Sequence, residues 1–238
     1  MKAPSFFPFS PTPTPTTNIF APSHSQTQTA TALRDKHAQR ACPETFGTNI
    51  FQLHSNNTYI EVFKHSQVDN NTLVAVCKIE EHTALIVDYD FIIQNQQLKI
   101  VYVTQRGDVV VYQSKDKAMF GFYHVWSGNV KGECLCVSAN PYEGCNEEFI
   151  VTCKGGNVYY YKYNDNTSEY NVKEVSSVFN RMEICDVQWN YVYGWECYFM
   201  KVWSNNNNAT TLIKVNDDFT KGEANPIDED ICKLFQQH

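Results

Sequence analysis

Three segments of the chain share one alternation of apolar and polar positions. They are residues 84–89, 134–139 and 184–189. Val87, Val137 and Val187 occupy corresponding places fifty residues apart, and apolar or small residues hold every second position around them. A period-two pattern predicts a strand with a buried face, and its return at a long, constant spacing predicts a repeated β-unit. We therefore expect these segments to be the innermost strands of successive units.

Further strand-like runs surround the first two of these segments. They are residues 73–79, 98–104 and 109–112 in the first unit, and residues 120–126, 149–152 and 158–161 in the second. A Thr-x-x-Gly turn precedes the last run of each unit, with Gly107 in the first and Gly155 and Gly156 in the second. Glycine suits this place because a tight hairpin needs positive φ.

The repeated unit indicates the architecture. Four strands in each unit of roughly 40 to 50 residues is typical of a propeller blade. The chain shows little of the 3.6-residue period that a helical solenoid requires. We predict an all-β protein of antiparallel four-stranded blades, and a β-sandwich is the structural alternative because it also uses short alternating strands.

The composition divides the chain into two parts. Residues 1–43 are rich in Pro, Thr, Ser, Gln and Ala, and Asp35 is the only acid among them. Such a stretch cannot bury enough apolar surface to offset the entropy lost on ordering, which predicts a disordered tail. Residues 44–238 would then form a partial propeller of about 3.5 to 4 blades. Residues 228–235 are expected to be either the inner strand of a further blade or a short helix.

An open propeller leaves strand edges unpaired, which invites association. We expect one of three situations. The chain is an incomplete product, or it associates with a second copy, or a partner donates the missing strands.

The bulk composition limits the classes of partner. The 238 residues are 42% hydrophobic, which is enough for a sizeable core, and the net charge of −7 argues against a partner that is a nucleic acid. There is no apolar run of about 18 residues, so we expect no insertion into a membrane. The nine cysteines are scattered through strand-like stretches, which is typical of reduced, buried thiols.

Motifs for catalysis or metal binding are missing from the sequence. Cys134 and Cys136 should project to the same side of one strand, but no second pair completes a zinc site. The turn with Gly155 and Gly156 lies between two strands, whereas a phosphate cradle opens a helix. We therefore predict no catalytic residue, no cofactor and no metal, and hence no enzyme.

The strand pieces resemble the WD-repeat family. Glu81-His82 before residues 85–91 resembles the Gly-His element that leads into the innermost strand of that family. Residues 201–204 resemble the close of its third strand, with Trp203 as the tryptophan of the Trp-Asp pair. The resemblance implies that His82 is a structural histidine inside a hydrogen-bond network. It also implies a non-enzymatic scaffold that contacts other proteins.

Residues 44–48 and 59–63, followed by the blocks 82–111 and 134–161, resemble the opening blades of WD-repeat nucleoporins. This resemblance implies a place in the nucleus, in the Y-shaped scaffold complex of the nuclear pore. Contacts with other pore subunits would there support pore assembly and the transport of protein and mRNA.

Two alternatives stay open. One is a WD-repeat adaptor in another intracellular complex. The other is a secreted or viral surface β-sandwich with paired cysteines and glycans on the Asn-x-Ser/Thr sites at Asn56, Asn70, Asn166 and Asn208.

Overall fold

The computed structural model describes ten stretches of the chain. They are residues 39–41, 49–54, 56–65, 73–94, 97–115, 121–142, 147–192, 197–204, 209–220 and 222–225. All of them belong to one compact unit, Thr27–Ile227. These residues form sixteen β-strands and one short 3-10 turn, Lys154–Gly156.

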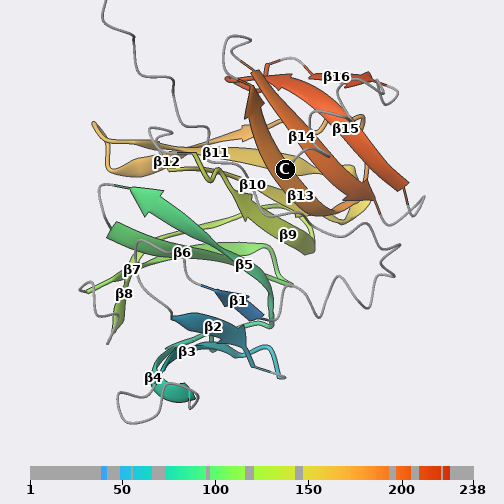
Figure 1. Cartoon of the computed structure of the whole chain (residues 1–238). Coiled ribbons are helices and arrows are strands. Elements are labelled where there is room, and N and C mark those ends of the chain that lie inside the picture. Colours follow the sequence, from blue (N-terminus) through green and yellow to red (C-terminus); the bar gives the residue numbers. More distant parts are fainter. Residues whose placement is uncertain are drawn as a thin grey trace, which may run out of the picture. The chain divides into compact units, whose positions relative to one another are not determined.

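The strands form four antiparallel four-stranded sheets, which we call blades A to D (Figure 1). Blade A contains β1 (Gln39–Ala41), β2 (Ile50–Leu53), β3 (Tyr59–His65) and β4 (Leu73–Glu80). Blade B contains β5 (Ile86–Gln94), β6 (Gln97–Thr104), β7 (Asp108–Ser114) and β8 (Phe122–Asn129). Blade C contains β9 (Cys134–Ala139), β10 (Glu148–Cys153), β11 (Val158–Asn164) and β12 (Glu169–Glu174). Blade D contains β13 (Ile184–Val192), β14 (Cys197–Ser204), β15 (Ala209–Asn216) and β16 (Gly222–Asn225).

In every blade the order of strands in the sheet follows their order in the chain. The strands β5, β9 and β13 each begin a blade, and they contact one another in series. The predicted all-β class and the four-stranded antiparallel blades are therefore confirmed. The β-sandwich alternative is wrong, because a sandwich packs two sheets and these residues form four.

The first blade begins earlier than the sequence indicated. Strand β1 lies at Gln39–Ala41, inside the range 1–43 that was predicted to be a disordered tail. Its residue Arg40 is bound by two carboxylates of β5, which explains why a polar segment is ordered there. Residues 1–38 and the segment 228–235 lie outside the described residues.

A β-bulge interrupts the first strand of blades B, C and D. In blade B the pairs on the two sides of the bulge are Ile86–Thr104 and Asp88–Val103, which leaves Val87 unpaired. In blade C they are Cys134–Cys153 and Cys136–Thr152, and in blade D they are Ile184–Ser204 and Asp186–Trp203. Ile86, Cys134 and Ile184 are thus equivalent, so Val87 corresponds to Leu135 and not to Val137. The predicted register of the first unit is wrong by two residues. An even shift keeps the face of a strand, which is why the pattern still identified the strands.

The bulge in blade C also corrects the prediction for its cysteines. Cys134 and Cys136 flank the extra residue Leu135 and pair with adjacent residues of β10. Adjacent residues of a strand point to opposite faces. Cys134 accordingly packs in the core between blades B and C, whereas Cys136 packs in the core between blades C and D.

Trp203 lies on a different strand from the one predicted. It is on β14, the second strand of blade D, and not at the close of the third strand. The third strand is β15, which follows it in the chain.

Three apolar clusters fill the spaces between neighbouring blades. Phe51 of blade A packs with Tyr89 of blade B, Val103 of blade B packs with Val137 of blade C, and further apolar residues join blade C to blade D. The central strands β6 and β10 are buried along nearly their whole length. A strand that is buried on both faces has a nearly continuous apolar sequence, as residues 100–103 of β6 and 149–151 of β10 do.

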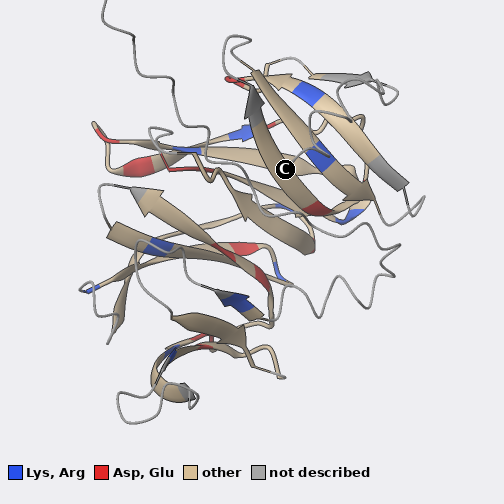
Figure 2. Cartoon of the chain, viewed as in Figure 1, with Lys and Arg blue, Asp and Glu red and all other residues tan. Residues whose placement is uncertain are grey.

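A charged clasp joins the first strands of blades A, B and C. Arg40 of β1 binds Asp88 and Asp90 of β5 at 3.0 and 2.8 Å, and Figure 2 shows the basic and acidic segments next to each other. The second oxygens of the two carboxylates accept the backbone N–H groups of Val137 and Ala139 of β9, at 3.0 and 2.8 Å. Burial by itself would lower the pKa of Arg40, but the two carboxylates outweigh it and raise that pKa.

Candidate functional site

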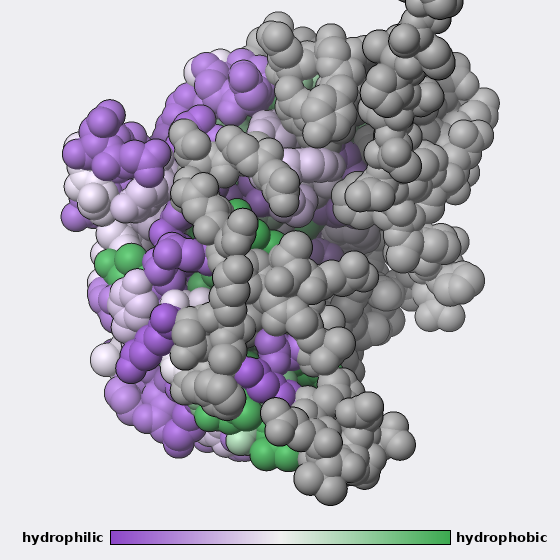
Figure 3. Space-filling view, turned by 60° about the vertical axis from the view of Figure 1, so that its left-hand side comes forward, coloured by the Kyte–Doolittle hydropathy of each residue, from purple (hydrophilic) through white to green (hydrophobic). Residues whose placement is uncertain are grey.

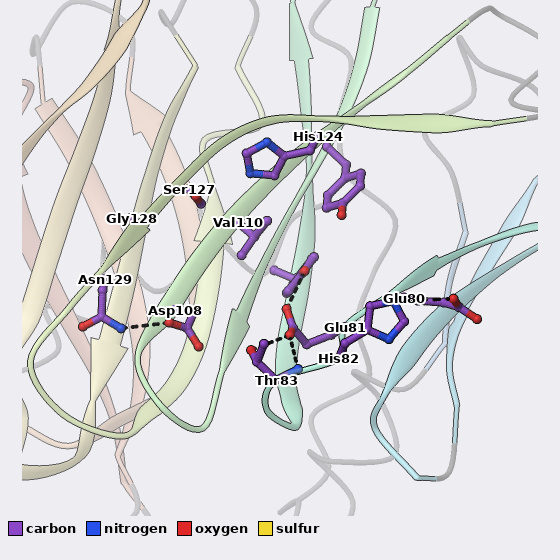
Figure 4. A pocket seen from close by; sticks show the side chains of 12 residues that line it. Glu80, Glu81, His82, Thr83, Asp108, Val110, His124, Ser127, Gly128 and Asn129 are labelled. Carbon is purple, nitrogen blue, oxygen red and sulfur yellow. Dashed lines mark hydrogen bonds and ion pairs between the residues drawn. The ribbon is translucent and has the colours of Figure 1, made fainter.

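An open groove lies where blade A connects to blade B, with a volume of about 580 Å³ (Figure 4). This is within the ordinary range for a binding site. Its lining comes from the end of β4, the connection to β5, and strands β6, β7 and β8. The lining residues are Glu80, Glu81, His82, Thr83, Tyr102, Asp108, Val110, Tyr112, His124, Ser127, Gly128 and Asn129.

Aromatic rings form one part of the groove. The rings of Tyr102 and Tyr112 are stacked, with their centroids 6.1 Å apart. The ring of His124 meets Tyr112 edge-on at 5.7 Å. Val110, on the same strand as Tyr112, is buried. Tyr102 is only 1% exposed, so the rings that a ligand can reach are those of the half-buried Tyr112 and the exposed His124. The face of a tyrosine ring attracts cations, so Tyr112 can pack against an alkyl chain and its charged end.

A fixed carboxylate, that of Glu81, lies beside the rings. It accepts hydrogen bonds from the N–H and the hydroxyl of Thr83, at 2.7 and 2.6 Å, and from the hydroxyl of Tyr102 at 2.8 Å. Partial burial favours a higher pKa for Glu81, but the hydrogen bonds outweigh it and the pKa lies below its usual value. Glu81 is therefore a permanent negative charge at neutral pH.

A second carboxylate, Asp108, is held at the start of β7. It accepts a hydrogen bond from the hydroxyl of Thr104 at 2.7 Å and another from the side-chain amide of Asn129 at 3.0 Å. Its own backbone N–H donates to Thr104. The side chain is thus fixed in orientation before any ligand binds.

The third carboxylate, Glu80, is already paired with the ammonium group of Lys78, and both side chains are exposed. His82 approaches Glu80 at 3.7 Å, and its own side chain is 79% exposed. His82 therefore lies on the rim of the groove, in contrast to the structural histidine inside a hydrogen-bond network that the sequence suggested. The network at this place is centred on its neighbour Glu81.

This arrangement is suited to binding a cation and less suited to proton transfer. A general acid or base works best with a pKa near the working pH, whereas the pKa of Glu81 is lowered. In the part of the chain that the structure describes, no three His, Cys, Asp or Glu residues are grouped as metal ligands. Across the same residues, no helix is long and apolar enough to cross a membrane.

The turn glycines lie at the ends of the blades. Gly107 precedes Asp108 with φ of +90°, and a Cβ there would lie 2.4 Å from the carbonyl oxygen of Val130. Gly156 has φ of +76°, and a Cβ would lie 1.9 Å from the carbonyl oxygen of Arg181, whereas Gly155, at φ of +77°, faces open space. The last of the predicted structural residues, Trp203, is half-buried with the ammonium of Lys201 5.1 Å from its ring, outside the groove.

Hydrophobic residues on the surface are scattered. The large apolar residues with the most exposure are Val74, Leu85, Tyr123, Val125 and Val172. Among the residues that carry a hydropathy colour in Figure 3, most are hydrophilic and the hydrophobic ones lie in separate patches. Such patches are ordinary on a folded protein, so they do not mark a site by themselves.

Comparison with known proteins gives one kind of match. No protein-family model matches the chain, and no match was found among the curated proteins. The crystal structure of the WD40 domain of SCAP from fission yeast superposes on 79% of this chain, with a TM-score of 0.51 and 10% sequence identity.

The superposition covers 40% of the SCAP chain, so this chain spans less than half the length of the protein that it matches. At this identity the likeness concerns the fold alone. Together with the four antiparallel sheets it shows that the chain has a WD-repeat-like β-propeller fold, of which the described residues form four blades.

Proposed function

We propose that the chain is a non-enzymatic scaffold, and that the groove on blade B binds a positively charged segment of a partner protein. The observation that carries the proposal is the pair of fixed carboxylates, Glu81 and Asp108, beside the half-buried ring of Tyr112, which stacks on the buried ring of Tyr102. Rigid blades that present such a surface suit recognition, because the binding groups lose little freedom when a ligand arrives.

Charge complementarity selects the kind of segment. Lys78 neutralises Glu80 at the rim, whereas the hydrogen-bond donors of Glu81 and Asp108 are neutral side chains and a backbone amide. Two negative charges thus face the groove with only hydroxyl and amide partners. A lysine or arginine side chain can approach them while its alkyl part covers the half-buried ring of Tyr112.

The test is a binding titration with short fluorescent peptides on the full chain. We expect an arginine- and lysine-containing peptide to bind, a peptide with glutamine at those positions to bind at least tenfold more weakly, and added salt to weaken the interaction. Glu81→Gln and Asp108→Asn should each lower the affinity about tenfold, the effect of roughly 1.4 kcal/mol.

Asp165→Asn is the matched control, because Asp165 is exposed on the turn between β11 and β12, outside the groove. It should leave the affinity unchanged. Equal affinities for the chain and for both groove variants, each with an unaltered melting temperature, would show that the groove is not the binding site.

For the cellular setting we propose the scaffold complex of the nuclear pore, in the nucleus. The support is the resemblance of residues 44–48, 59–63, 82–111 and 134–161 to WD-repeat nucleoporins. Proximity labelling in cells should then mark subunits of the Y-shaped complex, and the tagged chain should lie at the nuclear rim. Labelling of another assembly, without pore subunits, would favour a WD-repeat adaptor elsewhere while leaving the groove test intact.

A further inference from the structure

Two cysteines of blade C lie directly opposite each other. Cys134 begins β9 and Cys153 ends β10, so the pair is at the open end of this hairpin. The two residues pair with each other in the sheet, just before the bulge at Leu135. Sequence reasoning had linked Cys134 with Cys136, which the bulge turns to the other face.

The backbone geometry at this pair is the one that a disulfide requires. The N–H of Lys154 donates to the carbonyl of Glu133 at 2.9 Å, one residue beyond the pair on each strand. That pattern marks Cys134 and Cys153 as a non-hydrogen-bonded pair, whose Cα atoms lie about 4.5 Å apart. Disulfides span Cα separations of about 4.4 to 6.8 Å.

The side chains also face each other. Both pack in the core between blades B and C, with 1% and 0% of their surfaces exposed, and both are free thiols. The interaction between the two thiols raises the pKa of Cys134, which burial raises further, and lowers the pKa of Cys153. Cys153 is therefore the better nucleophile of the two.

Other described cysteines of blades C and D have different surroundings. The sulfur of Cys136 lies 3.1 Å from the hydroxyl of Thr152, and Cys185 donates to the carbonyl of Trp203 at 3.3 Å. Neither has a cysteine opposite it in the sheet. Cys77 pairs with Val62, and Cys197 pairs with Val192 and Asn216. Among the cysteines in the described part of the chain, only Cys134 and Cys153 therefore have the geometry for a cross-strand bond.

The cover over this pair is thin. Gly132 is exposed and has φ of +119°, and a Cβ there would lie 3.6 Å from the Cβ of Cys153. Because glycine has no side chain, that space is not filled by residue 132. The neighbouring residues Lys131 and Lys154 are also exposed. A small opening of this turn would admit a small oxidant to the thiols.

We propose that Cys134 and Cys153 are an oxidant-sensitive site, which a hydroperoxide converts to a cross-strand disulfide. The thiolate of Cys153 attacks the peroxide; the O–O bond breaks, an alcohol or water leaves, and Cys153 becomes a sulfenic acid. The sulfur of Cys134 then attacks that sulfur; the S–O bond breaks, the S–S bond forms, and water leaves with the proton of Cys134. Two thiols are oxidised and one peroxide is reduced.

The experiment treats the full chain with hydrogen peroxide, alkylates the remaining thiols, and maps the linked peptides by mass spectrometry. A protease that cuts after glutamate separates Cys134 from Cys153, because Glu147 and Glu148 lie between them. We expect a linked pair of peptides that have lost two hydrogen atoms and separate on reduction. Cys136→Ser, which removes the other cysteine of the first peptide, should leave the link in place.

Cys134→Ser should abolish the link and let a sulfenic acid accumulate on Cys153, which a dimedone adduct detects. The reverse variant, Cys153→Ser, should abolish both signals at this pair. A linked peptide that survives Cys134→Ser, or alkylation of both thiols after peroxide treatment of the unaltered chain, would overturn the proposal. Circular dichroism of each variant shows whether the fold is retained.

Discussion

Replacing Arg40 by methionine should destabilise the protein strongly. Arg40 is the cation between Asp88 and Asp90, and the side chain of Asp88 is only 3% exposed. Removing one partner from a buried ion pair costs about 3 to 5 kcal/mol, because the remaining charge stays buried without a counter-charge. The Arg40 side chain is 19% exposed, so water relieves part of this cost and we expect the lower end, about 3 kcal/mol.

The loss should depend on pH. Burial raises the pKa of Asp90 above its usual value, although Arg40 opposes the shift. Without Arg40 the pKa of Asp90 rises further. A carboxyl whose pKa is raised by folding favours the folded state while it is protonated, and that contribution is lost as the pH rises through the pKa of the folded state. The deficit of the variant should therefore be largest at neutral pH and shrink in acid.

The assay is urea unfolding at several pH values, with the free energy extrapolated to water. Arg40→Met combined with Asp90→Asn should lose less than the sum of the two single changes, since the pair interacts directly. Lys78→Met, which breaks an exposed pair with Glu80, is the control and should change stability little. A deficit for Arg40→Met that is no larger than for this control at neutral pH would refute the reasoning.

Two further changes test the turns and the core between blades. Gly155→Ala should lower the free energy of unfolding by about 1 kcal/mol, because of the left-handed backbone alone. Gly156→Ala should lower it at least twice as much, because its new Cβ meets the carbonyl of Arg181. Thermal unfolding of the two variants measures the difference. Tyr89→Phe removes a buried hydrogen bond of 2.8 Å to the carbonyl of Phe51. It should lower the free energy of unfolding in urea by about 1 to 3 kcal/mol. A change under about 0.3 kcal/mol would show that water replaces the hydroxyl.

The strands and their antiparallel blades could be predicted from the sequence because their signals are local. Alternation marks a half-buried strand, and Gly107 and Gly156 mark turns whose backbone only glycine adopts easily. The bulges could not be predicted in this way. An extra residue such as Leu135 looks like any other strand residue in the sequence. In the sheet, however, it makes the side chains that precede it point to the opposite face from the one that alternation predicts.

The site depends on contacts that the sequence separates widely. Arg40 lies in a polar segment and meets Asp88, 48 residues away, so its own neighbourhood gave no sign that it is ordered. In the groove, Glu81 of the connection between β4 and β5 lies next to Tyr102 of β6. Asp108 of β7 lies next to Asn129 of the paired strand β8. Only the register of blade B places these groups together.

Asp88 and Asp90 give the first strand of blade B a particular consequence for unfolding. Each carboxylate holds the guanidinium of the preceding blade with one oxygen and a backbone amide of the following blade with the other. Repeat proteins often melt one repeat after another, because each repeat interacts only with its neighbours. The departure of blade A would remove the cation from these two carboxylates, and the departure of blade C would remove a backbone hydrogen-bond donor from each. Blades A, B and C should therefore melt in one cooperative transition, with hydrogen exchange protecting all three to a similar free energy.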